Sequence, residues 1–339
     1  MSKTTVELGE NYIRLCDCTL QGNKVSLNSY TEQQNTPLFF NLLSEKATSE
    51  TAKIIDTLFA ASKITSKNVN IVIPDAYTYA QITQMPRLKE KELLSAIRYQ
   101  ADQFIPLPLE EAALDLEILY EDKTNNNLLV LIVAASQKII SNITNLIEQS
   151  GLIPESIENE LSSSGRFFTQ FYKPPVDKKG TIFINFGYST SSLYFFHNKF
   201  SLLTDSHVIK IGFELFLKEI KANINVDNQK ATEALKAIGF NPTSSVNISD
   251  ILNPVITDLQ MEIKKFMVAI EEKYKVPVDQ VYLYNNAYQI NKFPEALAQH
   301  LGIAASLYDT SSAVIKTNQT LTNTVPPSSM ITVIGGSLK

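Results

Sequence analysis

Hydrophobic and polar residues alternate along the start of the chain in a pattern that predicts short β-strands. The three expected strands are Thr4–Leu8, Tyr12–Leu20 and Lys24–Tyr30. From Ser44 to Ser62 the apolar residues recur at the spacing of one helix face, which predicts a helix. The apolar run within Asn68–Pro74 then predicts a short buried strand.

The same order of elements begins again near residue 181. The three strands expected there are Thr181–Asn185, Ser191–Phe196 and Lys199–Thr204. Helical spacing follows at Ile209–Ile220, and a later strand and helix are predicted at Val281–Tyr284 and Ala296–His300. A repeat at this scale is informative about architecture. Two such lobes are typical of the actin-like (ribonuclease H-like) α/β fold.

An additional α+β subdomain is expected between the two lobes, at residues 79–160. An amphipathic helix is predicted at Lys89–Phe104. Two strands, Ala113–Tyr120 and Asn127–Ala135, and a helix at Gln137–Ser150 follow it. The expected organisation is therefore a first lobe (1–78), the inserted subdomain (79–160), a connection (161–180) and a second lobe (181–339), whose C-terminal segment packs back on the first lobe.

Composition and charge bear on the classes of partner. Lys and Arg total 30 against 35 Asp and Glu, so the formal net charge is -5 and nucleic-acid binding is not expected. The longest apolar run, Leu128–Ala135, is far shorter than the ~20 residues that span a bilayer. The N-terminus, Met1–Thr5, lacks the apolar core of a signal peptide. We therefore expect a cytoplasmic protein without direct membrane insertion.

The residue types that usually carry metal or hydrolase chemistry are sparse. Cys16 and Cys18 lie at alternate positions of one predicted strand, where free cysteines commonly pack as small apolar residues. His197, His207 and His300 have no ligand spacing with one another. The sequence contains neither a Gly-x-Ser-x-Gly elbow nor a P-loop. No metal site and no catalytic residue are expected.

The strongest motif is the segment from Met85 to Glu111, which reads MPRLKEKELLSAIRYQADQFIPLPLEE. It combines a Met-Pro pair, a helix with Glu-Leu and an Ile-Pro-Leu-Pro-Leu box. This string resembles the inserted subdomain of the PilM family of type IV pilus assembly proteins. The rest of the chain follows the same order of elements with weaker identity.

The resemblance implies a scaffold or adaptor of a type IV pilus machine, peripheral to the inner membrane through a partner. That partner would be a PilN-like single-span membrane protein, bound by its cytoplasmic N-terminal tail; a homo-oligomeric ring is left open. A nucleotide-binding actin-like ATPase and an FtsA-like filament protein are the alternatives. FtsA-like proteins usually end in a basic amphipathic helix, which Ser328–Lys339 does not provide.

The resemblance also implies a nucleotide cleft with one tight turn from each lobe, where glycine lets the backbone approach phosphate. In the first turn Gly9 matches the family glycine and Arg14 replaces its lysine. Glu7 is longer than the family aspartate, and Glu10 replaces a small hydroxyl residue. Two like charges ~4 Å apart repel by ~4 kcal/mol at an effective dielectric of ~20, so Glu10 would weaken phosphate binding.

The remaining cleft positions depart from the family pattern as well. By resemblance they are Asn185, Gly187, Ser189, Thr190, Ser191, Glu262, Lys265, Asn285 and Asn286. Asn185 is neutral where the family is acidic, Asn285-Asn286 replace a Gly-Gly turn, and Lys292 replaces a later glycine. Glu262 and Lys265 equally fit an exposed helical ion pair, and the second turn equally fits a hairpin corner. We expect a degenerate site, no enzymatic activity and no cofactor, with ATP and magnesium as the alternative.

Overall fold

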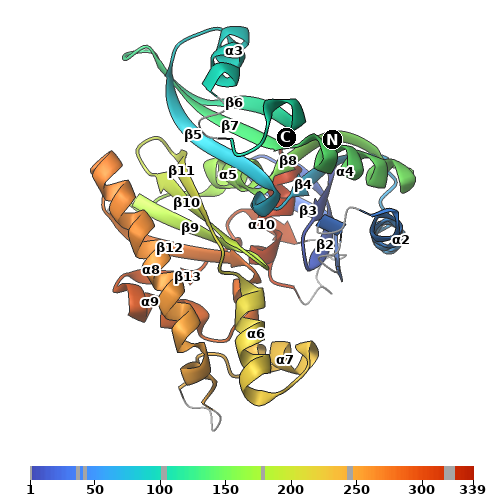
Figure 1. Cartoon of the computed structure of the whole chain (residues 1–339), viewed down its shortest axis with the longest axis vertical. Helices are drawn as coiled ribbons and strands as arrows, with labels where there is room; N and C mark the ends of the chain where they lie inside the picture. Colours follow the sequence, from blue (N-terminus) through green and yellow to red (C-terminus); the bar gives the residue numbers. More distant parts are fainter. Residues whose placement is uncertain are drawn as a thin grey trace. The chain divides into compact units, whose positions relative to one another are not determined.

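The structure of the protein is a computed structural model that describes residues 2–35, 39–40, 44–100, 105–176, 180–242, 247–316 and 325–339, without the side chains of residues 90 and 100. The chain divides into two compact units (Figure 1). The first comprises Met1–Gln170, Val314–Asn323 and Thr332–Lys339; the second comprises Phe171–Ala313 and Thr324–Ile331. Residues 101–104 of the predicted helix and 177–179 of the predicted connection lie outside the described residues.

The first unit contains a six-stranded sheet in the order β14-β3-β2-β1-β4-β8. Its strands are β1 (Lys3–Leu8), β2 (Tyr12–Gln21), β3 (Lys24–Gln34), β4 (Asn68–Ile73), β8 (Ile153–Asn159) and β14 (Val314–Lys316). β1, β2 and β3 are antiparallel neighbours, whereas β4 lies parallel to β1, and β8 parallel to β4. The late strand β14 pairs in parallel with β3, so a C-terminal segment completes the N-terminal sheet.

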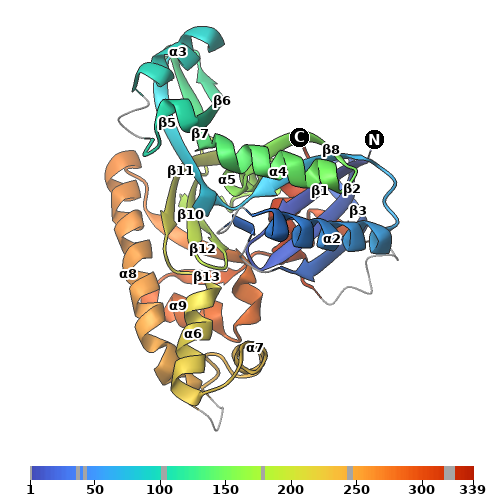
Figure 2. The same ribbon diagram turned by 45° about the vertical axis from the view of Figure 1, so that its right-hand side comes forward.

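Helices pack on both faces of this sheet (Figure 2). On one face, α2 (Glu45–Ser62) and α4 (Gln137–Gln149) bury apolar residues against alternate residues of the strands, such as Val6 and Leu8. On the opposite face, α10 (Ile331–Gly336) approaches so closely that a Cβ on Gly336 would lie 2.6 Å from Thr5 Cγ2. α5 (Glu160–Phe171) follows β8 directly.

The first unit also contains the inserted subdomain, a three-stranded antiparallel sheet in the order β5-β7-β6. Its elements are β5 (Thr78–Pro86), α3 (Glu90–Gln100), β6 (Ala112–Asp122) and β7 (Asn127–Ser136). Leu93 and Ile97 of α3 pack on one face, against Val130 and Ile132 of β7. β6 is an edge strand, and its pairing with β7 is irregular between Ile118 and Tyr120.

The second unit contains a five-stranded sheet in the order β11-β10-β9-β12-β13. The strands are β9 (Gly180–Phe186), β10 (Ser191–His197), β11 (Leu202–Ile209), β12 (Val278–Asn285) and β13 (Ala304–Leu307), and the helices are α6 (Phe213–Ile224), α7 (Asn228–Ala237), α8 (Ile248–Tyr274) and α9 (Phe293–Leu301). Alternate strand residues such as Ile182 and Ile184 form the core with these helices. Phe183 and Tyr282 belong to an aromatic cluster on the other face of the sheet.

The described residues also contain the 3₁₀ turns η1 (Asp75–Tyr77), η3 (Leu109–Glu111), η4 (Asn286–Gln289) and η5 (Pro327–Met330). Within the described residues, no helix is long and apolar enough to cross a membrane.

The predicted start of the helix at Ile209 is wrong. Ile209 is the last residue of β11, and α6 begins at Phe213 and continues to Ile224. Gly212 separates the two elements in an extended conformation, where an added Cβ would lie 2.3 Å from the carbonyl oxygen of Tyr188. The boundary is therefore set by a tertiary contact, which periodicity does not reveal. The elements that were not predicted include β5, β8, α5, α7, β13, β14 and α10.

Candidate functional site

The turn between β1 and β2 is the first of the two predicted phosphate turns. A Cβ on Gly9 would lie 2.5 Å from the carbonyl oxygen of Tyr12, so the chain approaches itself too closely for any other residue. Asn35 holds this turn: its Nδ2 donates to the Gly9 oxygen at 3.0 Å, and its backbone N–H donates to Asn11 at 2.8 Å. The turn is therefore tight and braced by the end of β3.

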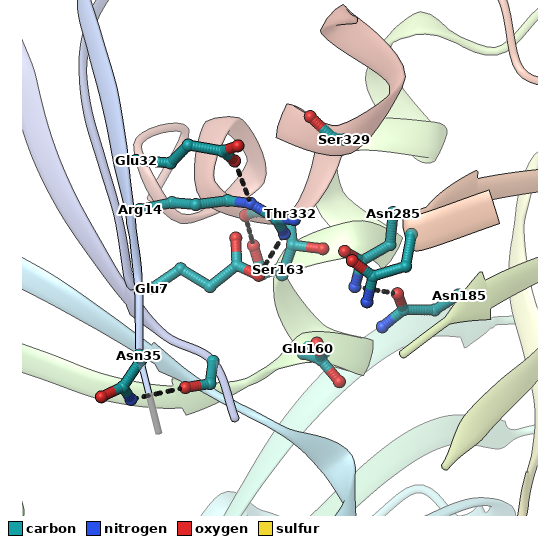
Figure 3. A network of polar contacts seen from close by, with 12 residues as sticks. Glu7, Arg14, Glu32, Asn35, Glu160, Ser163, Asn185, Asn285, Ser329 and Thr332 are labelled. Atoms are coloured by element: carbon teal, nitrogen blue, oxygen red, sulfur yellow. Dashed lines mark hydrogen bonds and ion pairs between the residues drawn. The ribbon is translucent and has the colours of Figure 1, made fainter. Parts of the chain in front are cut away.

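Arg14, the predicted replacement for a phosphate-binding lysine, lies between two carboxylates (Figure 3). Its Nη1 donates to Glu7 Oε1 at 2.9 Å and its Nε to Glu32 Oε2 at 3.2 Å. The strand register explains this arrangement, because Glu7, Arg14 and Glu32 are direct neighbours across β1, β2 and β3. The Tyr30 hydroxyl donates to Glu32 at 2.9 Å. The charge of Arg14 is thus compensated within the unit.

The buried position of Glu7 has electrostatic consequences. Burial raises the pKa of Glu7 above its usual value, although the charge of Arg14 and its hydrogen bond act in the opposite direction. Its second oxygen, Oε2, is buried and has no hydrogen-bond partner among the described residues. Glu7 therefore carries one paired and one unpaired carboxylate oxygen.

Glu10, which is expected to face phosphate, accepts a hydrogen bond from a tyrosine. The Tyr77 hydroxyl donates to Glu10 Oε1 at 2.9 Å, and Glu10 is buried. Asp75, at the start of η1, has its backbone N–H bound to Glu160 Oε2 at 3.1 Å, while its own carboxylate accepts from Leu161 N at 3.0 Å. The start of α5 and η1 are thereby tied together by reciprocal hydrogen bonds.

The second predicted turn, between β9 and β10, has the same geometry as the first. A Cβ on Gly187 would lie 2.5 Å from the carbonyl oxygen three residues later, that of Thr190. The oxygens of Gly187 and Tyr188 accept the first backbone N–H groups of α6, at 3.0 and 2.9 Å. The Ser191 hydroxyl donates to Ile211 at 2.6 Å, whereas Ser189 and Thr190 are half-buried. The turn therefore caps α6.

Three asparagines, Asn185, Asn285 and Asn286, stand at predicted cleft positions of the second unit, and Asn185 and Asn285 are hydrogen-bonded to each other (Figure 3). Asn285 Nδ2 donates to Asn185 Oδ1 at 2.8 Å, and Asn185 Nδ2 is buried without a partner in the described part of the chain. Asn286 accepts from Gln289 at 2.7 Å within η4. Asn285 and Lys292, both at expected glycine positions, have positive φ values of 62° and 58°. At both positions the backbone therefore has the positive φ that favours glycine, although each residue carries a side chain.

Glu262 and Lys265 pair with each other on the surface of α8. The distance between Lys265 Nζ and Glu262 Oε1 is 2.6 Å, and the Lys265 side chain is 72% exposed. This is the ordinary arrangement of opposite charges three residues apart on a helix.

A separate feature of the first unit is a cavity of about 330 Å³ between the inserted sheet and the β8–α5 segment. Its lining comprises Asp115, Leu116, Glu117, Leu131, Val133, Ile157, Glu158, Asn159, Ser162, Arg166, Leu338 and Lys339. Two of the contributing strands, β6 and β8, are the edge strands of their sheets. Unpaired backbone groups of an edge strand are suited to binding an extended segment.

Arg166 fixes one wall of this cavity. Its Nη1 and Nη2 donate to Glu158 at 3.1 and 2.6 Å, and Nη1 also donates to the oxygen of Gly335 at 2.7 Å. Burial alone would lower the pKa of Arg166, but the hydrogen bonds and charge of Glu158 raise it overall. Ser163 also donates to the oxygen of Thr332. The C-terminal segment is therefore bound to α5, where it contributes Leu338 and Lys339 to the lining.

Comparison with known proteins identifies the family. A family model described as type IV pilus assembly protein PilM matches residues 6–333. The chain belongs to the PilM family. A solved structure described as a PilM–PilN type IV pilus biogenesis complex has a TM-score of 0.83 at 17% identity, covering 100% of this chain and 98% of that one. The ethanolamine utilization protein EutJ from Carboxydothermus hydrogenoformans has a TM-score of 0.57 at 12% identity, covering 100% and 89%.

These comparisons confirm the predicted actin-like α/β fold and the resemblance to PilM. The cavity was missed, because its lining comes from β6, β7, β8, α5 and the C-terminal segment of this PilM-family chain. The sequence does contain one partial signal for it. Acidic and apolar residues alternate from Asp115 to Ile118, which indicates a strand with one acidic face.

Proposed function

We propose that this chain is a cytoplasmic adaptor of a type IV pilus machine, peripheral to the inner membrane. It binds the cytoplasmic N-terminal tail of a PilN-like membrane protein in the cavity of the first unit. This proposal rests on the cavity, to which two edge strands, β6 and β8, contribute lining residues. The similarity to a structure described as a PilM–PilN complex supports the choice of partner.

The lining of the cavity is suited to an extended peptide. Val133 and Ile157 offer apolar surface, and full burial of one large aliphatic side chain of a ligand contributes about 1.5–3 kcal/mol. The edges of β6 and β8 offer backbone donors and acceptors. A short tail that fills the cavity and pairs with one edge would therefore bind without a large interface.

The test is calorimetric titration of the protein with a synthetic peptide of the whole cytoplasmic tail of the PilN-like protein encoded with it. Val133→Asp places a charge at the cavity and is expected to weaken binding at least about tenfold. The matched control is Val208→Asp, at a residue of β11 in the second unit that is 41% exposed. Equal affinity of both variants and the unchanged protein, with both variants folded, would rule out the cavity as the tail site.

We also propose that the nucleotide positions have become structural, so that the protein is not an ATPase. Three contacts support this. Arg14 is held by Glu7 and Glu32, the carbonyls of the second turn cap α6, and Asn285 is bonded to Asn185. A phosphate would compete with Glu7 and Glu32 for Arg14, and neither Asn185 nor Asn285 is a strong magnesium ligand.

A second candidate function is nucleotide binding. It is favoured by two buried atoms without a described partner, Glu7 Oε2 and Asn185 Nδ2, because buried polar atoms are normally hydrogen-bonded. Titration with magnesium-ATP separates the candidates. We expect no heat and no thermal shift at millimolar ATP, whereas micromolar binding would support the actin-like ATPase alternative. Polymers that sediment in a pelleting assay would instead support an FtsA-like filament.

A further inference from the structure

We propose that the free edge of β6 recognises a tail in which two basic residues, separated by one apolar residue, pair with Asp115 and Glu117. The inference rests on the proposed function, because it specifies the chemistry of the segment that the cavity binds. It specifies which residues of the tail are basic and which residues of β6 they pair with; we call this requirement the charge rule.

The register of the inserted sheet places both acidic side chains on the cavity face. Asp115 lies opposite Val133 and Glu117 opposite Leu131, and all four residues line the cavity. Leu116, between them, lies opposite Ile132 on the face that α3 covers. β6 therefore presents two acids, two residues apart, beside the apolar residues of β7.

The basic residues of the lining compensate these acids only in part. Both basic residues of the lining face Glu158: Arg166 donates to it at 2.6 Å, and Lys339 Nζ lies 3.8 Å from it. Asp115 and Glu117 are exposed, and neither forms an ion pair with any residue that the structure describes, although Asp115 Oδ1 accepts a hydrogen bond from the backbone N–H of Leu116 at 2.8 Å. Glu117 acts on Arg166 only through space, where its charge raises the pKa of the guanidinium. With three acidic side chains against two basic ones, the formal side-chain charge of the lining is -1.

The spacing of Asp115 and Glu117 along β6 predicts which positions of a paired segment carry basic residues. A segment added beside β6 rises by about 3.3 Å per residue, so its alternate residues face Asp115 and Glu117 in turn. Opposite charges directly across two strands attract, whereas like charges repel. The residue between them would lie beside Leu116, and a neighbouring one beside Ile118, which is 44% exposed. A basic–apolar–basic segment therefore complements this edge.

The competing explanation is that the acids merely protect an edge strand. Exposed edges commonly carry charges and irregularities that prevent pairing between copies, and β6 has both. In that case the acids would matter for self-association and not for tail binding. The two explanations differ in which measurement changes when the charges are removed.

The experiment compares tail affinity in the unchanged protein, in Asp115→Asn/Glu117→Gln, and in the control Glu271→Gln/Glu272→Gln, an exposed acidic pair on α8. Removing the β6 charges is expected to weaken binding of the synthetic tail about 2- to 30-fold and to reduce its salt dependence, with no change in the control. A charge swap sharpens the test. Asp115→Lys/Glu117→Lys should bind poorly to the natural tail and better to a tail whose basic residues are replaced by Glu.

The outcomes separate this inference from the proposed function. If Val133→Asp leaves tail binding intact, the cavity is not the site and both fail. If Val133→Asp abolishes binding but the β6 variants bind normally, only the charge rule fails. Dimers of Asp115→Asn/Glu117→Gln on size-exclusion chromatography, with unchanged tail affinity, would assign the acids to edge protection. A cavity-bound tail without basic residues at alternate positions would also overturn the inference.

Discussion

Replacement of Arg14 by methionine tests whether this residue is a structural ion-pair partner. Met is similar in length but uncharged, so it would leave Glu7 and Glu32 facing an apolar side chain. Their side chains are only 3% and 13% exposed, so water compensates them poorly. At separations near 3 Å and an effective dielectric of ~20, each contact has a gross Coulomb energy of about 5 kcal/mol.

Desolvation offsets much of that gross energy, and removing one partner of a buried pair typically costs about 3–5 kcal/mol. A unit of this size loses about 2–4 °C of melting temperature per kcal/mol, so Arg14→Met should lower the melting temperature of the first unit by about 6–20 °C. The chain has no tryptophan, so circular dichroism is the suitable readout, with hydrogen exchange across β1–β3 to locate the effect.

The pH dependence of Arg14→Met gives an independent check. Arg14 lowers the pKa of Glu7, so its removal should raise that pKa further. A carboxyl with a raised pKa binds more protons in the folded than in the unfolded state, so stability falls as pH rises from the unfolded pKa through the folded one. The loss of folding stability caused by Arg14→Met should therefore be smaller in acid. The double variant Arg14→Met/Glu7→Gln should recover part of that stability at neutral pH. Unchanged stability, together with loss of measurable ATP binding, would show that Arg14 is a ligand residue.

Three further predictions concern the second unit. Gly187→Ala places a Cβ 2.5 Å from the Thr190 oxygen and should lower the free energy of unfolding by about 1–3 kcal/mol, measured by chemical denaturation. An unchanged denaturation midpoint would mean that the turn relaxes without cost. Lys265→Gln should change stability by less than about 1 kcal/mol, because the ion pair with Glu262 is largely exposed; a larger loss in the same assay would indicate an additional partner. Burial lowers the pKa of His197, so the unfolded state binds more protons and stability should decrease as pH falls below about 6.5. His197→Asn should flatten that slope in thermal melts, and an unchanged slope would point to another group.

Local patterns in the sequence determined most of the elements that build the two sheets. Alternation of apolar and polar residues in β1 and β2, and a short apolar run in β9 and β10, are properties of a single strand, so these four could be recognised without their neighbours. The apolar stripe of α2 is likewise local, as is the glycine of each tight turn. The repeated order of three strands and a helix then predicted the actin-like fold, which the comparisons confirm.

Tertiary structure decided the properties that depend on distant partners. The start of α6 depends on Gly212 lying against Tyr188, and the pairing of Arg14 depends on the register of three strands. The resemblance to PilM assigned Arg14 to a phosphate position, which stays a prediction, and only the strand register shows that Glu7 and Glu32 lie beside it across the sheet. The cavity is the extreme case, since Asp115, Glu158 and Lys339 meet only after two edge strands and a C-terminal segment have been brought together by packing.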